Sequence, residues 1–379
     1  MKNAILNFLT QEPIVPLFRP FQQGAVTIFM LHRFADVAYG NRGHSIEVLR
    51  ANLSFLRRHK VRLIGLPEIL RDLDEQRSGS AVAFTVDDGY GDFARVAAPV
   101  FAEFDCPVTV FITTGFVDGG FWMWWDKIIW ACIESRRSAV QLQIAGNPYA
   151  YALDGSASRW AAAADLIERL KRFPDAMMQR AIDDLLRAAD VELPPDLPRM
   201  FLPMTWDDIA RLGKAGVTFG PHTLTHPILS QVDDARSRAE LEGSWQRLQA
   251  ATTSAIPVFC YPNGDYASFT DRERRTVKEM RMRACVLAEQ HFTTLAHAKP
   301  ASVGFTTELP RYAYPDDVAQ FRQIVTGLER MKRTVRNLLP SSSATAAATD
   351  RADGSALRAG VDRPRTFLAD MSRTLDSND

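Results

Sequence analysis

Short apolar runs alternate with helical patterns along most of this chain, and this alternation limits the folds that the chain can adopt. The apolar runs lie at residues 26–31, 81–86, 107–112, 217–219, 257–259 and 284–287. Their length and continuity are typical of strands that are buried on both faces. Helical periodicity separates them, for example after the candidate N-cap Ser45 and over residues 234–251. The pattern predicts parallel strands with right-handed crossovers, and therefore an α/β barrel or an open doubly wound sheet.

Two segments interrupt this alternation. Residues 119–200 carry an aromatic cluster at 121–125 and then two helical patterns, near 158–173 and 174–189. We expect an insertion on the frame without a core of its own, in which most aromatic rings pack internally and Trp125 and Asp126 are candidates for sugar binding.

The C-terminal part of the chain is the second interruption. A helix is predicted over 317–339, whereas residues 341–379 contain too few apolar side chains to pack and are predicted to be a disordered tail. Residues 22–340 form one predicted barrel domain, and residues 119–200 are an insertion within it.

Composition excludes several classes of protein. The 45 Lys+Arg residues balance 45 Asp+Glu residues, which argues against a dedicated nucleic-acid partner. The four cysteines have no C-x-x-C spacing, so a zinc knuckle or redox pair is not expected. The N-terminal residues make a poor signal peptide, and no apolar run approaches the ~18 residues of a membrane helix. We therefore expect a soluble, cytoplasmic protein without an integral membrane segment.

Acidic and imidazole side chains follow two of the predicted strands. Asp87 and Asp88 end the strand at 81–86, and Gly89 permits a bend there. His222 and His226 follow the strand at 217–219; because Pro227 disfavours helical geometry at His226, we place this pair on a loop.

The carboxyl ends of parallel strands meet at one end of a fold. Two histidines and one carboxylate gathered there predict a divalent-metal triad, and the second carboxylate is left to act as a base. A solvated turn with two unrelated histidines is the simpler alternative.

Several motifs in this chain resemble those of the polysaccharide deacetylases, the NodB-like carbohydrate esterases that include chitooligosaccharide deacetylases. T-V-D-D-G at 85–89 resembles their T-F-D-D-G motif, and H-T-L-T-H at 222–226 resembles their H-[ST]-x-x-H motif. F-C-Y-P-N-G at 259–264 is similar to an F-x-Y-P-x-G variant of their third motif, and F-I-T-T-G at 111–115 to their F-F-x-x-G strand.

The resemblance implies a distorted (β/α) barrel of about seven strands and metal-assisted removal of N-acetyl groups from a saccharide. Asp88, His222 and His226 would hold the divalent metal, zinc, and Asp87 would be the general base. The backbone N–H of Tyr261 would stabilise the developing oxyanion. The expected partner is a carbohydrate that bears N-acetyl groups.

Two further roles rest on weaker similarities. Met30-Leu31-His32 resembles the Y-H-R strand end of permuted family members, which makes His32 the candidate general acid. Leu309-Pro310-Arg311 resembles a late L-P-R strand, and we expect Arg311 to pair with an active-site carboxylate, Asp87 in particular, in place of the missing third-motif arginine.

Two other functions remain compatible with these residues. One is a metal-dependent amidohydrolase of a small cyclic amide or ureide, because relatives with the Y-P-x-G variant include such enzymes. The other is a non-catalytic glycan-binding protein with a vestigial site, although the intact Asp-Asp and His-x-x-x-His motifs argue against it.

Overall fold

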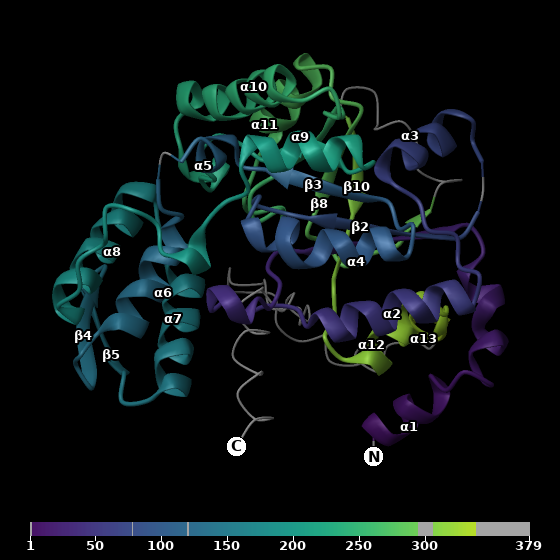
Figure 1. The fold of residues 1–379 in the computed structure, drawn as a ribbon, viewed down its shortest axis with the longest axis horizontal. Coiled ribbons are helices and arrows are strands. Elements are labelled where there is room, and N and C mark those ends of the chain that lie inside the picture. The colour runs from purple at the N-terminus through teal and green to yellow at the C-terminus, as the bar shows by residue number, and fades with distance from the viewer. Residues whose placement is uncertain (1, 78, 120, 295–305, 339–379) are drawn as a thin grey trace, which may run out of the picture.

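The computed structural model describes residues 2–77, 79–119, 121–294 and 306–338. Parallel strands surrounded by helices form the larger part of the molecule, and a mainly helical part lies at one side (Figure 1). The predicted tail, 341–379, lies outside the described residues. Within them, no helix combines the length and the hydropathy needed to cross a membrane.

The parallel strands belong to two hydrogen-bonded sheets. They are β1 (Ala25–Leu31), β2 (Ala81–Val86), β3 (Val108–Ile112), β6 (Thr218–Pro221), β7 (Val258–Cys260), β8 (Ala284–Leu287), β10 (Thr307–Pro310) and β11 (Tyr312–Ala313). The larger sheet has the order β11-β1-β2-β3-β6, with β9 (Thr293–Thr294) antiparallel to β1, and the smaller sheet has the order β10-β8-β7.

The two sheets meet at both edges. On one side, only Arg311 separates β10, which pairs with β8, from β11, which pairs with β1. On the other side, the segment before β7 binds β6, since the Ile256 N–H donates to the Phe219 carbonyl oxygen at 2.8 Å. The two sheets together therefore form a closed ring. If β10 and β11 are counted as one interrupted strand, this ring is the distorted barrel of about seven strands that the resemblance implied.

Helices cover the outside of this barrel. They are α1 (Lys2–Leu9), η1 (Val15–Gln22), η2 (Val37–Tyr39), α2 (Ile46–Arg58), α3 (Leu66–Asp74), η3 (Phe93–Ala97), α4 (Ala98–Glu103), α5 (Thr114–Val117), α9 (Trp206–Lys214), η5 (Leu229–Gln231), α10 (Asp234–Ala251), α11 (Asp271–Glu279), α12 (Val318–Val325) and α13 (Leu328–Leu338). In the view of Figure 1, α9, α10 and α11 lie toward the top of the barrel and α2 and α4 lie below them, and residues of α2, α4, α9 and α10 share one outward-facing cluster. The predicted N-cap Ser45 accepts a hydrogen bond from the Val48 N–H at 3.2 Å.

One element prediction is wrong. The helix expected over 317–339 is divided into α12 and α13, because Gly327 adopts φ +97 and a side chain there would collide with the Phe18 carbonyl oxygen.

Strand side chains alternate between two apolar cores. Inward-facing residues are small or slender, such as Val26, Ile28 and Ala83, and they share one buried cluster with Val258 and Val286. Outward-facing residues pack against the helices in a second cluster; they include Phe29, Leu31, Phe84, Val86 and Val110. Strands buried on both faces explain the continuous apolar runs in the sequence.

The insertion at 119–200 contains α6 (Trp124–Glu134), β4 (Ala139–Ile144) paired antiparallel with β5 (Asn147–Ala152), α7 (Ser156–Leu170) and α8 (Asp175–Ala189), and η4 (Arg199–Phe201) follows it. The expectation that it lacks a core of its own is wrong, since residues of α6, β4, α7 and α8 form a separate buried cluster that Tyr90 and Phe116 join.

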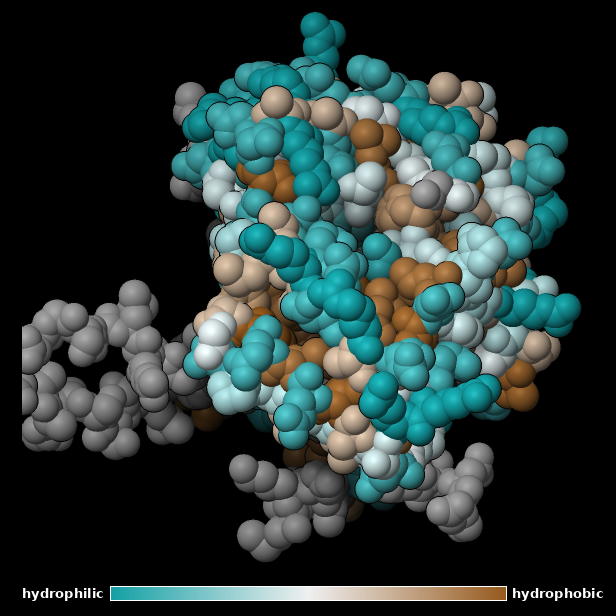
Figure 2. Space-filling model, turned by 90° about the vertical axis from the view of Figure 1, so that its left-hand side faces the viewer, coloured by the Kyte–Doolittle hydropathy of each residue, from teal (hydrophilic) through white to brown (hydrophobic). Residues whose placement is uncertain are grey.

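On the side of the molecule that carries the insertion, hydrophobic residues are exposed in patches between hydrophilic ones (Figure 2).

Candidate active site

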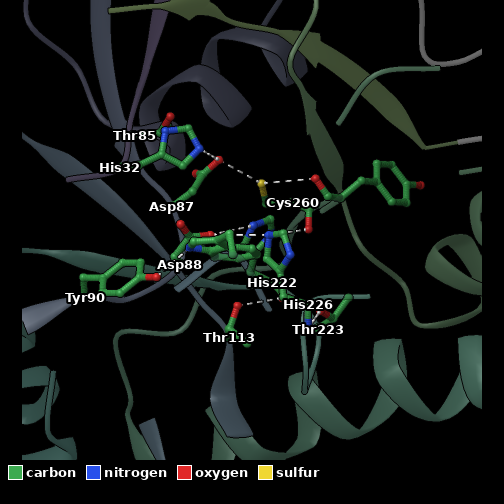
Figure 3. A network of polar contacts seen from close by, with 12 residues as sticks. His32, Thr85, Asp87, Asp88, Tyr90, Thr113, His222, Thr223, His226 and Cys260 are labelled. Atoms are coloured by element: carbon green, nitrogen blue, oxygen red, sulfur yellow. Dashed lines mark hydrogen bonds and ion pairs between the residues drawn. The ribbon is translucent and has the colours of Figure 1, made fainter. Parts of the chain in front are cut away.

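The residues singled out in the sequence meet at the carboxyl ends of the barrel strands (Figure 3). His32 directly follows β1, Asp87 and Asp88 follow β2, and His222 follows β6. Arg311 interrupts the β10–β11 strand. Cys260, the last residue of β7, joins them, although sequence reasoning had given it no role.

Left-handed backbone conformations direct both carboxylates into one site. Successive strand residues point to opposite faces, so Asp87 and Asp88 on a regular strand would diverge. Instead, Asp88 has φ +74 and Gly89 has φ +93, which turns the chain immediately after β2. A left-handed aspartate is an uncommon and strained conformation that is found preferentially at functional sites.

Asp88, His222 and His226 form a compact group of three buried side chains. The Asp88 Oδ1 atom lies 3.5 Å from His222 Nε2 and 3.4 Å from His226 Nε2. With zinc–ligand bonds of about 2.1 Å, the corners of a tetrahedron lie about 3.4 Å apart. The donor atoms of these three residues and the two distances that Asp88 makes therefore fit a zinc ion.

The two histidines differ in what holds their second ring nitrogen. His222 Nδ1 contacts the Cys260 carbonyl oxygen at 2.8 Å, so Nδ1 carries a hydrogen and Nε2 is the atom that faces Asp88. His226 Nδ1 is buried and has no hydrogen-bond partner among the described residues. Burial and the neighbouring His222 lower the pKa of His226 to about 3, which leaves a neutral imidazole at pH 7.

Asp87 is fixed by a guanidinium group. Arg311 Nη1 and Nη2 donate to the two Asp87 carboxylate oxygens at 2.7 and 2.8 Å, in the pairing expected from the sequence. The Arg311 side chain is only 1% exposed, and Nη1 also donates to the Thr85 hydroxyl at 3.0 Å. Burial alone would raise the pKa of Asp87, but Arg311 outweighs it and the pKa is lowered, so Asp87 is ionised near neutral pH.

His32 is the most accessible of the site residues. Its Nε2 lies 3.9 Å from Asp87 Oδ2, and 22% of its side chain is exposed. Burial lowers the pKa of His32 despite the nearby Asp88 and Asp87, and this keeps the ring neutral at pH 7. His32 thus lies between the buried carboxylate and solvent.

The side chain of Tyr261 contacts residues outside the Asp88, His222 and His226 group. Its ring stacks on Phe269, with 4.0 Å between centroids, and its hydroxyl contacts Cys285 at 3.5 Å. Its backbone directly follows Cys260, whose thiol lies 3.5 Å from Asp87 Oδ2.

The loop that carries the two histidines is held by an acid that sequence reasoning missed. The Glu240 carboxylate, on α10, accepts hydrogen bonds from the Leu224 and Thr225 N–H groups at 2.9 and 2.8 Å. Thr223 supports the same loop, as its hydroxyl oxygen accepts from the His226 N–H at 3.0 Å. Glu240 lies in the middle of a polar helix, so the sequence offers no local signal for it.

Comparison with known proteins gives one sequence match. A family model described as polysaccharide deacetylase matches residues 154–285, which contain His222, His226 and Tyr261. A search of curated proteins finds no match to this sequence.

Solved structures with a similar fold include two named proteins. The deacetylase PplD from Streptococcus pyogenes, solved in complex with acetate, is 15% identical with a TM-score of 0.50, over 80% of this chain and 97% of that one. IcaB from Ammonifex degensii is 14% identical with a TM-score of 0.49, over 80% and 97% of the two chains. The family match over residues 154–285 and the fold shared with PplD agree with the resemblance predicted from the motifs.

Proposed function

We propose that the protein is a metal-dependent deacetylase that hydrolyses N-acetyl groups on a saccharide. The observation that carries this proposal is the close approach of Asp88 to both His222 and His226, at distances that suit a shared metal ion, beside a second carboxylate, Asp87, that Arg311 holds ionised. The matching family supports an N-acetylated carbohydrate as the substrate.

Amide hydrolysis requires a strong nucleophile and a polarised carbonyl group. A divalent cation held by Asp88, His222 and His226, zinc on the basis of the donor set, would polarise the acetyl carbonyl and lower the pKa of a water molecule. Asp87 then accepts the proton of the attacking water. Arg311 keeps Asp87 in its charged, proton-accepting form and fixes the direction of its oxygens.

The later steps concern the oxyanion and the leaving amine. The Tyr261 backbone N–H is the proposed donor to the developing oxyanion. His32 is the proposed acid for the amine. Because its lowered pKa leaves it neutral at pH 7, it must gain a proton before it donates one, and Asp87, 3.9 Å away, is the group that has just accepted a proton.

Acetate release from N-acetylated chitooligomers and other N-acetylated glycans tests this proposal. We expect zinc-loaded protein to release acetate and Asp87→Asn to reduce kcat about 10²- to 10⁴-fold, because the base is lost. Asp72→Asn is a matched control, since Asp72 is also buried and paired with an arginine, Arg62, at 2.7 Å but lies outside the site.

Two outcomes would contradict parts of this scheme. Unchanged activity in Asp87→Asn would remove Asp87 as the base. A purified protein without bound metal, whose glycan binding is insensitive to a chelator and which releases no acetate, would instead support the glycan-binding alternative.

A further inference from the structure

The orientation of His226 requires an explanation, because its second ring nitrogen has no hydrogen-bond partner among the described residues. A histidine that ligates a metal usually donates its other N–H to an acceptor, which fixes the ring. His222 follows this rule through the Cys260 carbonyl oxygen. A different contact must therefore fix His226.

Trp125 supplies such a contact. Its ring lies edge-to-face with the His226 ring, with centroids 4.6 Å apart and planes at 77°. The His222 ring packs on His226 with a centroid separation of 4.8 Å and an angle of 81°. Trp125 and His226 are both buried, with 7% and 5% of their surface exposed. Rings packed in this way restrict the rotation of the imidazole about its side-chain bonds.

A chain of hydrogen bonds holds Trp125 in turn. Its indole Nε1–H donates to the Tyr90 hydroxyl oxygen at 2.8 Å, and the Tyr90 hydroxyl donates to Asp126 Oδ2 at 2.7 Å. The order follows from the indole, which can only donate: the Tyr90 hydroxyl oxygen accepts from it, and the hydroxyl hydrogen is left to donate to Asp126 Oδ2.

Tyr90 connects this chain to the loop that carries Asp88. It lies two residues after Asp88, and its ring is packed by the Arg33 guanidinium, 3.8 Å from the ring centroid, and by Phe116. Trp125 and Asp126 belong to the first turn of α6 in the insertion. The insertion is therefore tied to the two loops that supply Asp88 and His226.

We propose that Trp125 is a positioning residue for the metal ligand His226, and that Tyr90 and Asp126 hold Trp125 in place. Ring packing takes over the role of the hydrogen bond that His226 Nδ1 does not make with any described residue. In this way the insertion completes the metal site although it contributes no ligand. The inference rests on the proposed metal-dependent function in one respect, namely that His226 ligates the cation.

Metal affinity tests the inference independently of turnover. Metal-free, full-length protein is titrated with Zn²⁺ in competition with a chromophoric chelator, for the wild type, Tyr90→Phe and Trp125→Phe. Both variants keep an aromatic ring but break the hydrogen-bond chain. We expect each to weaken Zn²⁺ binding about 10- to 100-fold, as is typical when groups that orient metal ligands are changed. The visible spectrum of the Co²⁺ form should also change, because it reports the ligand geometry.

Matched substitutions separate positioning from general packing. Trp124→Phe changes the neighbouring buried tryptophan, and Tyr151→Phe removes a hydroxyl that donates to Asp165 at the same 2.7 Å distance elsewhere in the insertion. We expect both controls to bind Zn²⁺ like the wild type, with all four variants showing cooperative thermal unfolding when metal-free.

The possible outcomes distinguish this inference from the proposed function. Wild-type affinity in Tyr90→Phe and Trp125→Phe, with weak binding in His226→Ala, would overturn the positioning role and leave the proposed function intact. An equal loss in the two controls would also overturn it, because insertion packing in general would then be responsible. If the wild type bound no Zn²⁺ and His226→Ala changed nothing, the proposed function would fall and this inference with it.

Discussion

Asp126 is a carboxyl group in an unusual environment, because it is fully buried and only one of its oxygens has a hydrogen-bond partner among the described residues. Burial raises the pKa of Asp126 to about 7, although Arg33 and the Tyr90 hydroxyl oppose this shift. An unfolded aspartate has a pKa of about 3.9. At a pH between these two pKa values, Asp126 is protonated in the folded protein and ionised in the unfolded chain.

This proton predicts a pH dependence of stability. Because the folded state holds more protons, the free energy of unfolding should fall as pH rises from about 4 to about 7, by up to about 1.4 kcal/mol per pH unit from this group. Below and above that window the contribution is constant. Urea unfolding of the wild type and Asp126→Asn at pH 5 and pH 8 measures it. The wild type should lose stability relative to the variant at the higher pH, and parallel pH profiles would contradict the assignment.

Among the elements, the loop between β6 and α10 shows how a short segment is held in an irregular shape. Thr223 and His226 have φ +65 and +55, so the two imidazoles are directed by left-handed turns rather than by helical spacing. Glu240 compensates for the missing regular hydrogen bonds by accepting from two N–H groups of this loop. Helix α10 therefore holds the loop of the proposed metal ligands through one buried carboxylate.

Glu240→Gln is expected to loosen this loop. The two loop N–H groups donate to Glu240 Oε2, and the Thr225 hydroxyl donates to the other oxygen, Oε1. An amide side chain has one acceptor oxygen, so the Thr225 hydroxyl loses its acceptor, at a cost of about 1–3 kcal/mol in the free energy of unfolding. Zn²⁺ affinity should fall about tenfold. Glu242→Gln on the same helix changes an exposed acid that pairs with Arg238 at 2.8 Å, and it should have neither effect. Chemical unfolding and Zn²⁺ titration of both variants test this prediction. If the two variants had the same free energy of unfolding and the same Zn²⁺ affinity, Glu240 would have no special role in the loop.

The sequence predicts an element well when the interactions that form it join residues that are close together in the chain, and poorly when they join distant residues. Asp87, Asp88 and the histidine loop could be found because strand ends and Pro227 carry local signals. Trp125, Tyr90 and Asp126 act through a contact between the insertion and the barrel, which no local pattern specifies. The break at Gly327 was missed for a similar reason, since it depends on the close approach of Phe18 from the other end of the chain.

Over the whole molecule, the barrel and the insertion have separate buried clusters, and the proposed metal site lies where the two meet. Its three ligands follow β2 and β6, which flank β3 in the larger sheet. A bound cation therefore connects parts of the barrel that are not neighbours in sequence.

Metal removal should consequently lower global stability. A ligand that binds only the folded state stabilises it by about 2.7 kcal/mol at one hundred times its Kd. Thermal unfolding with Zn²⁺ should therefore occur at a higher Tm than with EDTA, and His226→Ala should abolish the difference. Hydrogen exchange should slow chiefly in the loops after β2 and β6 rather than in α7. If Zn²⁺ slowed hydrogen exchange equally throughout the chain, or nowhere, this prediction would be contradicted.

The closure of the barrel at Arg311 also has a consequence for biosynthesis. Arg311 lies 224 residues after the carboxylate that it neutralises, so a ribosome completes Asp87 long before the matching charge exists. Until the β10–β11 segment emerges, sealing the barrel would bury an uncompensated anion, which is strongly unfavourable. We therefore expect the nascent chain to keep the proposed base exposed until its orienting partner has been made, and the competent site to form late in folding.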